Sequence, residues 1–310
     1  GKRRLLRLAL LHPTNAFGEP HKEAAVKTVL TIAGSDSSGG AGIQADIKTL
    51  TLNGVYAASA VTALTAQNTT GISAAFEVPR NFLQQQIDAV FEDLVPNAVK
   101  IGMISSVELI ETAADRLSAY HAEHIVADPV LAASSGKKLI RDDAIDCLKN
   151  RLFPIAELIT PNIPEAQLLS GISVRSKKDR IRCAQWLYET YGCAVLCKGG
   201  HDKETADDLL YADGAYRWFP GKRIEQPNTH GTGCTLSSAI AANLAKGFDL
   251  PSSIERAKDY TTHAIAFGLN LGAGSGPLHH AFDLNSRFAA NARQEQNNTT
   301  LNETKRKESL

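Results

Sequence analysis

The chain has 310 residues, 43% of them hydrophobic, which is enough for one large α/β domain or two ordinary ones. Lysine plus arginine equals aspartate plus glutamate at 33 each, which argues against a nucleic-acid-binding protein, since such proteins usually carry a basic surplus. The five cysteines follow no regular spacing, so we expect no disulfide scaffold and a cytoplasmic, reducing compartment.

Short apolar runs alternate along the chain with longer stretches of helical periodicity. The predicted strands are 26–33, 98–101, 124–127, 157–160 and 194–198. The predicted helices are 41–53, 79–93, 105–120, 141–151, 163–170, 178–191, 232–246 and 251–270. Strand then helix, repeated, predicts an α/β fold with a mostly parallel central sheet and helices on both faces.

Two regions break this rhythm, and two tails fall outside it. Residues 55–78 and 206–219 carry extra strand-like segments, which we expect to form a flap or a sheet edge. No linker rich in Pro, Gly or Ser interrupts 27–284, so we predict a single domain there. We expect 1–26 to be an N-terminal extension and 285–310 a polar, disordered tail. No apolar run approaches the ~20 residues of a membrane-spanning helix.

Gly-rich and polar clusters follow the predicted strands, where ligands bind in a parallel sheet. Segment 228–234, NTHGTGC, opens the predicted helix 232–246 with two glycines. Free amides and the helix dipole at such a start can bind an anion and can stabilise a phosphoryl group in transfer. The alternative is an ordinary Gly-rich helix entry.

Cys234 lies in the first turn of that predicted helix. The helix dipole is expected to lower the pKa of its thiol, so that it can act as a thiolate or a base. Phosphoryl transfer to an alcohol requires a group that takes the hydroxyl proton beside a phosphate site. The alternative is a small core cysteine.

Two further clusters suit phosphate and metal chemistry. Asn162 and Glu165 stand one helical turn apart and could hold a hydrated Mg²⁺; alternatively they cap a helix, with Asn162 as N-cap. Lys198 ends a predicted strand and precedes two glycines, which suits a phosphate contact as well as a solvated loop lysine.

Known nucleotide motifs are weak or missing. Residues 40–45 fit the pattern G-x-G-x-x-[GA], but no acidic residue ends a second strand about 20 residues on, which disfavours a dehydrogenase. No G-x-x-x-x-G-K-[ST] loop occurs in the sequence. ATP, if used, must therefore be held by another device, such as the late GTGC turn.

Six segments together resemble the hydroxymethylpyrimidine/phosphomethylpyrimidine kinases of the ribokinase-like superfamily. They are 31–46 (TIAGSDSSGGAGIQAD), 62–68 (TALTAQN), 100–103 (KIGM), 160–162 (TPN), 198–201 (KGGH) and 230–235 (HGTGCT). They occur in the family's order and span roughly 28–283. One departure is Ser134, where the family often has a lysine that approaches phosphates.

The resemblance implies a three-layer ribokinase-like fold, ATP as donor, Mg²⁺ and a homodimer. The implied reaction is two successive phosphorylations, of 4-amino-5-hydroxymethyl-2-methylpyrimidine and then of its monophosphate, for thiamine biosynthesis. The residues implied to contact the pyrimidine are Gln67, Gly34, Thr65, Met103, Val130 and Asp46.

The resemblance also assigns the chemistry at the helix start. Cys234 would be the base, and the amides of Gly231, Thr232, Gly233 and Cys234 would bind the transferring group. Lys198, Thr232 and Asp128 would contact ATP. The metal contacts, mostly through water, would be Asp128, Asn162 and Glu165.

Two other functions remain open. A pyridoxal/pyridoxine kinase of the same fold would also phosphorylate a hydroxymethyl group on a flat heterocycle, but Cys234 and Gln67 favour the pyrimidine. A catalytically silent ligand-binding protein on this scaffold is disfavoured by the joint presence of Lys198, Glu165 and Cys234.

Overall fold

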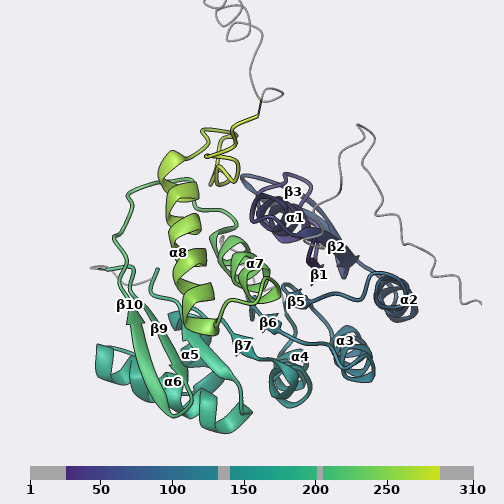
Figure 1. The fold of residues 1–310 in the computed structure, drawn as a ribbon, viewed down its shortest axis with the longest axis horizontal. Coiled ribbons are helices and arrows are strands. Elements are labelled where there is room, and N and C mark those ends of the chain that lie inside the picture. The colour runs from purple at the N-terminus through teal and green to yellow at the C-terminus, as the bar shows by residue number, and fades with distance from the viewer. Residues whose placement is uncertain (1–25, 132–139, 201–204, 287–310) are drawn as a thin grey trace, which may run out of the picture.

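The structure, a computed structural model, describes residues 26–131, 140–200 and 205–286. Ser134 and nearly all of the two predicted tails lie outside these residues. The strands of the main sheet are β1 (Thr28–Ala33), β2 (Tyr56–Val61), β5 (Ala98–Ile101), β6 (Ile125–Ala127), β7 (Leu158–Ile159), β8 (Ala194–Cys197), β9 (Asp208–Ala212) and β10 (Ala215–Phe219). Their spatial order is β10-β9-β8-β7-β6-β5-β1-β2 (Figure 1).

The sheet is parallel from β2 across to β8 and antiparallel at the β8-β9-β10 edge. A separate antiparallel ribbon is formed by β3 (Ala63–Asn68) and β4 (Gly71–Glu77). The region 55–78 therefore supplies both a sheet edge and a flap, and 206–219 supplies the other edge. The predicted mostly parallel sheet is confirmed.

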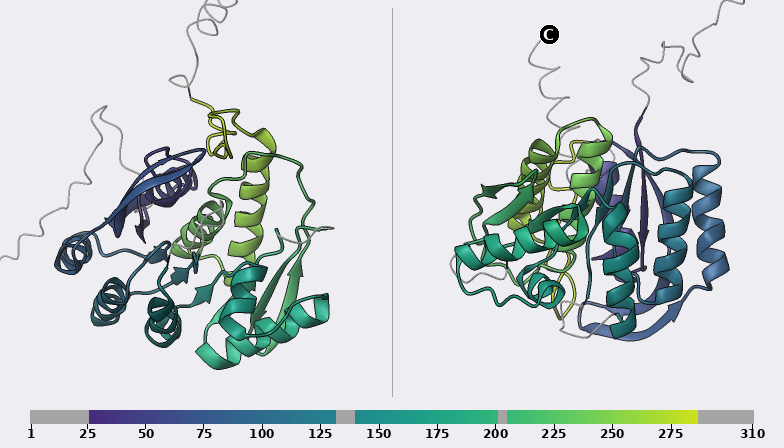
Figure 2. Two further views of the ribbon diagram at one scale, coloured as in Figure 1. Left: turned by 180° about the vertical axis from the view of Figure 1, so that it is seen from behind. Right: turned by 90° about the horizontal axis from the view of Figure 1, so that it is seen from below.

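Helices cover both faces of the sheet, as Figures 1 and 2 show from several sides. They are α1 (Gly42–Leu52), α2 (Arg80–Phe91), α3 (Val107–Ala119), α4 (Asp142–Cys147), α5 (Ile163–Ser170), α6 (Lys177–Tyr191), α7 (Thr232–Ala245) and α8 (Leu250–Phe267). A π-helical turn, Leu148–Leu152, and a 3₁₀ turn, Phe153–Ile155, continue α4. The helix expected over 141–151 therefore changes its winding halfway.

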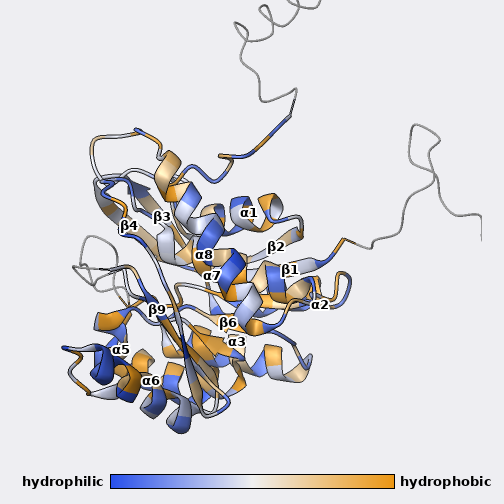
Figure 3. Cartoon of the chain, turned by 60° about the vertical axis from the view of Figure 1, so that its left-hand side comes forward, coloured by the Kyte–Doolittle hydropathy of each residue, from blue (hydrophilic) through white to orange (hydrophobic). Residues whose placement is uncertain are grey.

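Two cores, one on each face, hold these layers together. Leu30 of β1 packs in the core that contains Leu83 of α2, whereas its neighbour Val29 packs in the core that contains Ile240 of α7 and Ile254 of α8. Alternate strand residues point to opposite faces, so both faces need apolar side chains. Figure 3 shows the result: central strands coloured mainly hydrophobic, and hydrophilic residues on outer helices such as α6.

The parallel strands bring their carboxyl ends to one edge of the sheet, where the predicted polar clusters follow them. The start of α7 faces this edge: a Cβ placed on Gly233 would lie 3.2 Å from Asp128, the residue after β6. In the described part of the chain no helix combines the length and apolar character needed to cross a membrane.

Candidate active site

The site is organised around the first turn of α7. Gly231 caps this helix with a left-handed backbone (φ +86°) and no side-chain cap. A Cβ at this position would lie 2.0 Å from the carbonyl oxygen of Gly40, so only glycine lets the two loops approach so closely. The amides of Gly233 and Cys234 fall in the turn that lacks intrahelical acceptors. The structure therefore places two amides without intrahelical acceptors at this helix start.

The Thr232 hydroxyl donates to the Thr229 carbonyl at 2.8 Å, so this side chain already has a partner in the loop before α7. Cys234 is half-buried. Burial raises the pKa of the Cys234 thiol to about 11, with Lys100 opposing this shift and Asp46 adding to it. The predicted lowering of this pKa by the helix dipole is therefore wrong for the ligand-free protein, because burial outweighs it.

A lysine and two carboxylates meet beside the start of α7. Lys198 Nζ lies 2.6 Å from Asp128 Oδ1, which also accepts a hydrogen bond from the Thr160 hydroxyl at 2.9 Å. A Cβ on Gly233 would lie 3.2 Å from Asp128 Oδ2 and 3.4 Å from Lys198 Nζ. The Lys198 side chain is only 14% exposed, so it is not a solvated loop lysine. Burial works to lower the pKa of Lys198, but Asp128 and Glu165 outweigh it and raise that pKa.

Asn162 and Glu165 form a complete capping box at the start of α5. The Asn162 side chain accepts from the Glu165 amide at 2.9 Å, and the Glu165 carboxylate accepts from the Asn162 amide at 2.7 Å. The helix-cap alternative is confirmed. Burial raises the pKa of Glu165 to about 7 against the opposing charge of Lys198, and Asp128 adds to the rise. Among the described residues no three His, Cys, Asp or Glu side chains gather closely enough to hold a metal ion.

The residues expected to contact the pyrimidine come together from β1, the flap and β5. The Thr65 hydroxyl donates to the Ser35 carbonyl at 2.8 Å and lies 3.2 Å from Gln67 Oε1. A Cβ on Gly34 would lie 2.4 Å from Met103 Cε, so these two residues touch. Gln67, Thr65, Gly34 and Met103 thus lie close together, next to the end of β1.

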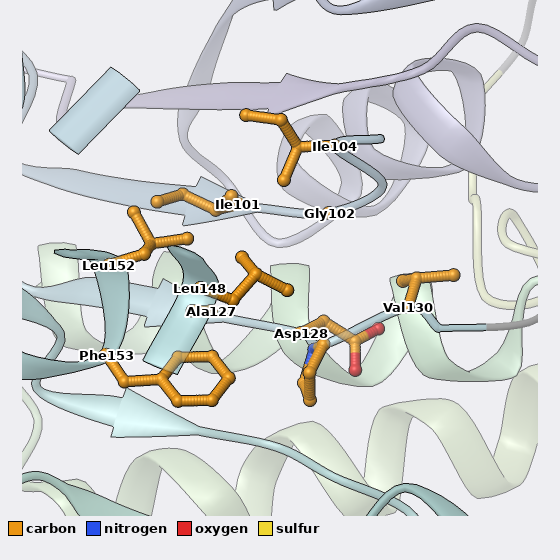
Figure 4. Close-up of a pocket in the computed structure, with 10 residues that line it drawn as sticks. Ile101, Gly102, Ile104, Ala127, Asp128, Val130, Leu148, Leu152 and Phe153 are labelled. Atoms are coloured by element: carbon orange, nitrogen blue, oxygen red, sulfur yellow. The ribbon is translucent and has the colours of Figure 1, made fainter. Parts of the chain in front are cut away.

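Val130 lies further along the edge of the sheet, beside Asp128. Figure 4 shows both residues beyond the end of β6, with Leu148, Leu152 and Phe153 on the opposite side of a cavity. This cavity has a volume of only ≈ 10 Å³, room for about one water molecule. It is a packing gap and not a substrate pocket.

A larger hollow of ≈ 470 Å³ lies against the flap beside Gln67. That volume is typical of a small-ligand site. Its lining residues are Ser37, Ala66, Gln67, Asn68, Thr70, Gly71, Ile72 and Ser73.

Asp46 differs from its expected place among the substrate contacts. Its side chain has no exposed surface, and its carboxylate accepts hydrogen bonds from Thr31, Lys100 and Ser238 at 2.7 to 2.9 Å. A carboxylate so enclosed supports the site from behind and does not reach a ligand. The sequence motif that contains Asp46 does not reveal which way its side chain points.

His230 and Asp36 belong to the recognised sequence motifs, but the sequence alone indicates no role for them. His230 Nε2 lies 2.8 Å from Asp36 Oδ2 and 3.2 Å from Gln67 Nε2, so it links the loop after β1 to the flap. Burial opposes ionisation of Asp36, but hydrogen bonds from His230, Ser38 and Ala41 lower its pKa to about 2. Asp36 stands in the Gly-rich segment after β1 and His230 in the Gly-rich segment before α7, and these segments were the available signal.

A parallel sheet whose carboxyl edge faces a Gly-rich helix start without a side-chain cap, with a lysine and carboxylates beside it, is the arrangement expected of a small-molecule kinase. Residues 36–279 match the family described as phosphomethylpyrimidine kinase. The chain belongs to this family, and it is a phosphotransferase.

Two relatives by sequence agree with this assignment, and a solved structure shares the fold. The hydroxymethylpyrimidine/phosphomethylpyrimidine kinase of Haemophilus influenzae is 44% identical over 260 residues, 82% of this chain and 97% of that protein. A thiamine biosynthesis bifunctional protein of Geobacter sulfurreducens is 48% identical over 254 residues; the match covers 82% of this chain but 52% of that protein, about half its length. The structure of a Bacillus subtilis pyridoxal kinase, an ADP complex, superposes with a TM-score of 0.78 at 34% identity, covering 84% of this chain and 100% of that one. The predicted family and three-layer fold are confirmed.

Proposed function

We propose that this protein transfers the γ-phosphoryl group of ATP to the hydroxymethyl group of 4-amino-5-hydroxymethyl-2-methylpyrimidine, and then a second one to the monophosphate, for thiamine biosynthesis. The observation that carries the proposal is the position of Cys234 in the first turn of α7, which has no side-chain cap and lies beside Lys198 and Asp128. The names of the relatives supply the substrate.

The chemistry follows from this arrangement. The hydroxymethyl oxygen attacks the γ-phosphorus, the bond to the β-phosphate oxygen breaks, and ADP leaves. The amides of Gly233 and Cys234 stabilise the negative oxygens in transfer, and Lys198 contacts the ATP phosphates. The hydroxyl proton passes to the Cys234 thiolate. Because a base must be deprotonated to accept a proton, a thiol pKa of about 11 predicts that kcat/KM rises with pH from about 7 to about 10.

We also propose Mg²⁺ as the companion of ATP. Asp128 and Glu165 supply oxygen ligands beside the helix start, and a hydrated Mg²⁺ needs few of them. Both carboxylates are more than nine-tenths buried, and the negative charge of Asp128 acts on Glu165. Asn162 would act through the α5 cap, since its side-chain oxygen already accepts the Glu165 amide. Bound there, Mg²⁺ would neutralise phosphate charge.

Gln67 is the proposed reader of the pyrimidine edge, because an amide presents donor and acceptor together to an aminopyrimidine. Thr65, Gly34, Met103 and Val130 would line the ring. The second candidate, pyridoxine kinase activity, is favoured by one observation: a relative 34% identical over most of the chain is a pyridoxal kinase.

Three wider properties belong to the same proposal. Leu64 and Phe76 are cross-strand neighbours on the flap, and they are 52% and 62% exposed, which supports a homodimer formed there. The continuous sheet supports one kinase domain over 27–284, with 1–26 and 285–310 outside it. All five cysteines are free, which supports a cytoplasmic location.

The test is ATP-dependent phosphate transfer to hydroxymethylpyrimidine, to its monophosphate and to pyridoxine, side by side. Cys234→Ala is expected to lower kcat by about 10²–10⁴-fold with little change in the KM for ATP. Gln67→Ala is expected to raise the KM for the pyrimidine. Cys147→Ala is the matched control, since Cys147 is also half-buried but lies beside Val107, on α3. Near-normal turnover of Cys234→Ala would reject the mechanism, and preference for pyridoxine would reject the substrate.

A further inference from the structure

A buried ion pair lies behind the start of α7, and the reaction described above does not use it. Lys100 on β5 and Asp46 on α1 have no exposed side-chain surface. The Lys100 Nζ lies 2.8 Å from both oxygens of Asp46, and the hydroxyls of Thr31 and Ser238 donate to the same carboxylate at 2.7 and 2.9 Å. The ammonium therefore has a fixed position.

Two helix starts bring this pair close to Cys234. Ser238 follows Cys234 by one turn on α7, and Asp46 follows Gly42 by one turn on α1, so each pair shares a helix face. The Ser238 hydroxyl donates to Asp46 at 2.9 Å, so the two helices are joined one turn beyond Gly42 and Cys234. Asp46 therefore contacts α7 one helical turn beyond Cys234, and Lys100 is bound to the same carboxylate.

The charges around the thiol pull its ionisation in opposite directions. The charged groups that face it in the described chain are Lys100, Asp46, Asp128 and Lys198. Burial raises the pKa of Cys234, Lys100 is the strongest opposing influence, and Asp46 and Asp128 add to the rise. Burial also works to lower the pKa of Lys100, but Asp46 and Cys234 outweigh it and raise that pKa, so its positive charge is retained in the core.

We propose that Lys100 is a positioning residue for Cys234: its buried ammonium, fixed by Asp46, favours the thiolate that accepts the proton of the substrate hydroxyl. The proposal rests on the proposed role of Cys234 as the base. A lysine in the interior of a strand that is otherwise Ala, Val and Ile has no solvent to reach, so its charge acts only on its neighbours.

The test measures the thiol directly. Alkylation of Cys234 by iodoacetamide is followed against pH by mass spectrometry of its peptide, with Cys147 as the internal control, in Lys100→Gln, Asp46→Asn and the double variant. We expect Lys100→Gln to raise the apparent pKa of Cys234 by about one unit, so that alkylation at pH 8 slows about tenfold. Asp46→Asn removes the opposing negative charge and is expected to speed it.

Opposite shifts would support the proposal, since a general loosening would speed alkylation in both single variants. Circular dichroism and thermal unfolding identify variants that fold. If the single variants do not fold, the double variant is used, because it keeps an uncharged hydrogen-bonded pair. Since Lys100 acts on Cys234 more strongly than Asp46 does, we expect slower alkylation of Cys234 in the double variant than in the wild type. Equal or absent shifts in folded variants would overturn the role of Lys100.

Kinase assays on the same variants separate this inference from the proposed function. If alkylation shifts as expected but the wild-type protein has no kinase activity, the electrostatic effect of Lys100 on Cys234 is retained and the role of Cys234 as the base is rejected. Unchanged alkylation in an active kinase would reject Lys100 alone.

Discussion

Replacing Gly231 by alanine is expected to destabilise the protein and to disable it. The left-handed backbone at this residue costs an alanine ~1–2 kcal/mol. Its Cβ would lie 2.0 Å from the Gly40 carbonyl oxygen, and real contacts start near 3.0 Å, so two backbone segments must separate by about 1 Å. Overpacking of this kind costs a further ~1–3 kcal/mol. The free energy of unfolding is therefore expected to fall by about 2–5 kcal/mol.

Gly247, just beyond the other end of α7, provides the matched control. It has nearly the same backbone angle, φ +88°, but a Cβ there would meet nothing within 4 Å. Gly247→Ala should therefore cost only the ~1–2 kcal/mol of the left-handed strain. Urea unfolding measures both, and initial-rate kinase assays should show a loss of about 10²-fold in kcat for Gly231→Ala alone, because the anion-binding amides move. Equal losses of stability in the two variants would refute the close approach of these loops.

Three further outcomes are expected. Gly34→Ala would push Met103 Cε, only 2.4 Å from the new Cβ, into the substrate space, so steady-state kinetics should show a raised KM for the pyrimidine while urea unfolding changes by under about 1 kcal/mol. Asp36 has a lowered pKa of about 2, so its ionised carboxylate stabilises the fold above its ordinary pKa, and this contribution is lost as the pH falls from about 4 to about 2. The free energy of unfolding, measured across this pH range, should fall by about 2 kcal/mol in the wild type. Asp36→Asn should lack this loss. Glu165 has a raised pKa of about 7, so the wild type without Mg²⁺ should lose stability as the pH rises from about 5 to about 8, and Glu165→Gln, which keeps an acceptor for the α5 cap, should remove that slope; an equal slope in both proteins would contradict the assignment.

The layered fold was predictable because its signals are local. A strand buried on both faces is a short apolar run, so 98–101 and 194–198 were placed within a residue of β5 and β8. The capping box predicted for Asn162 and Glu165 needs only residues three apart, and it is present. The change of winding at Leu148–Leu152 was not foreseen, because packing and not periodicity decides it.

The candidate site was predicted less completely, for a different reason. The helix dipole at Cys234 can be read from the sequence, but the burial that reverses its effect on the pKa depends on the surrounding core. Asp46 and Lys100 are 54 positions apart, and only the pairing of β1 with β5 and the packing of α1 bring them together. The one local hint was a charged residue inside an apolar strand, Lys100.

The burial of α7 bears on how the anion-binding amides behave over time. From Thr235 to Ala245 every residue of this helix is buried, so its first turn continues into a helix that is packed in the core on one face of the sheet. Local opening of such a helix would uncover both neighbouring layers and would require nearly global unfolding. Its dipole therefore keeps one direction throughout turnover, and no energy is spent on reorienting it when charge develops on the phosphoryl group.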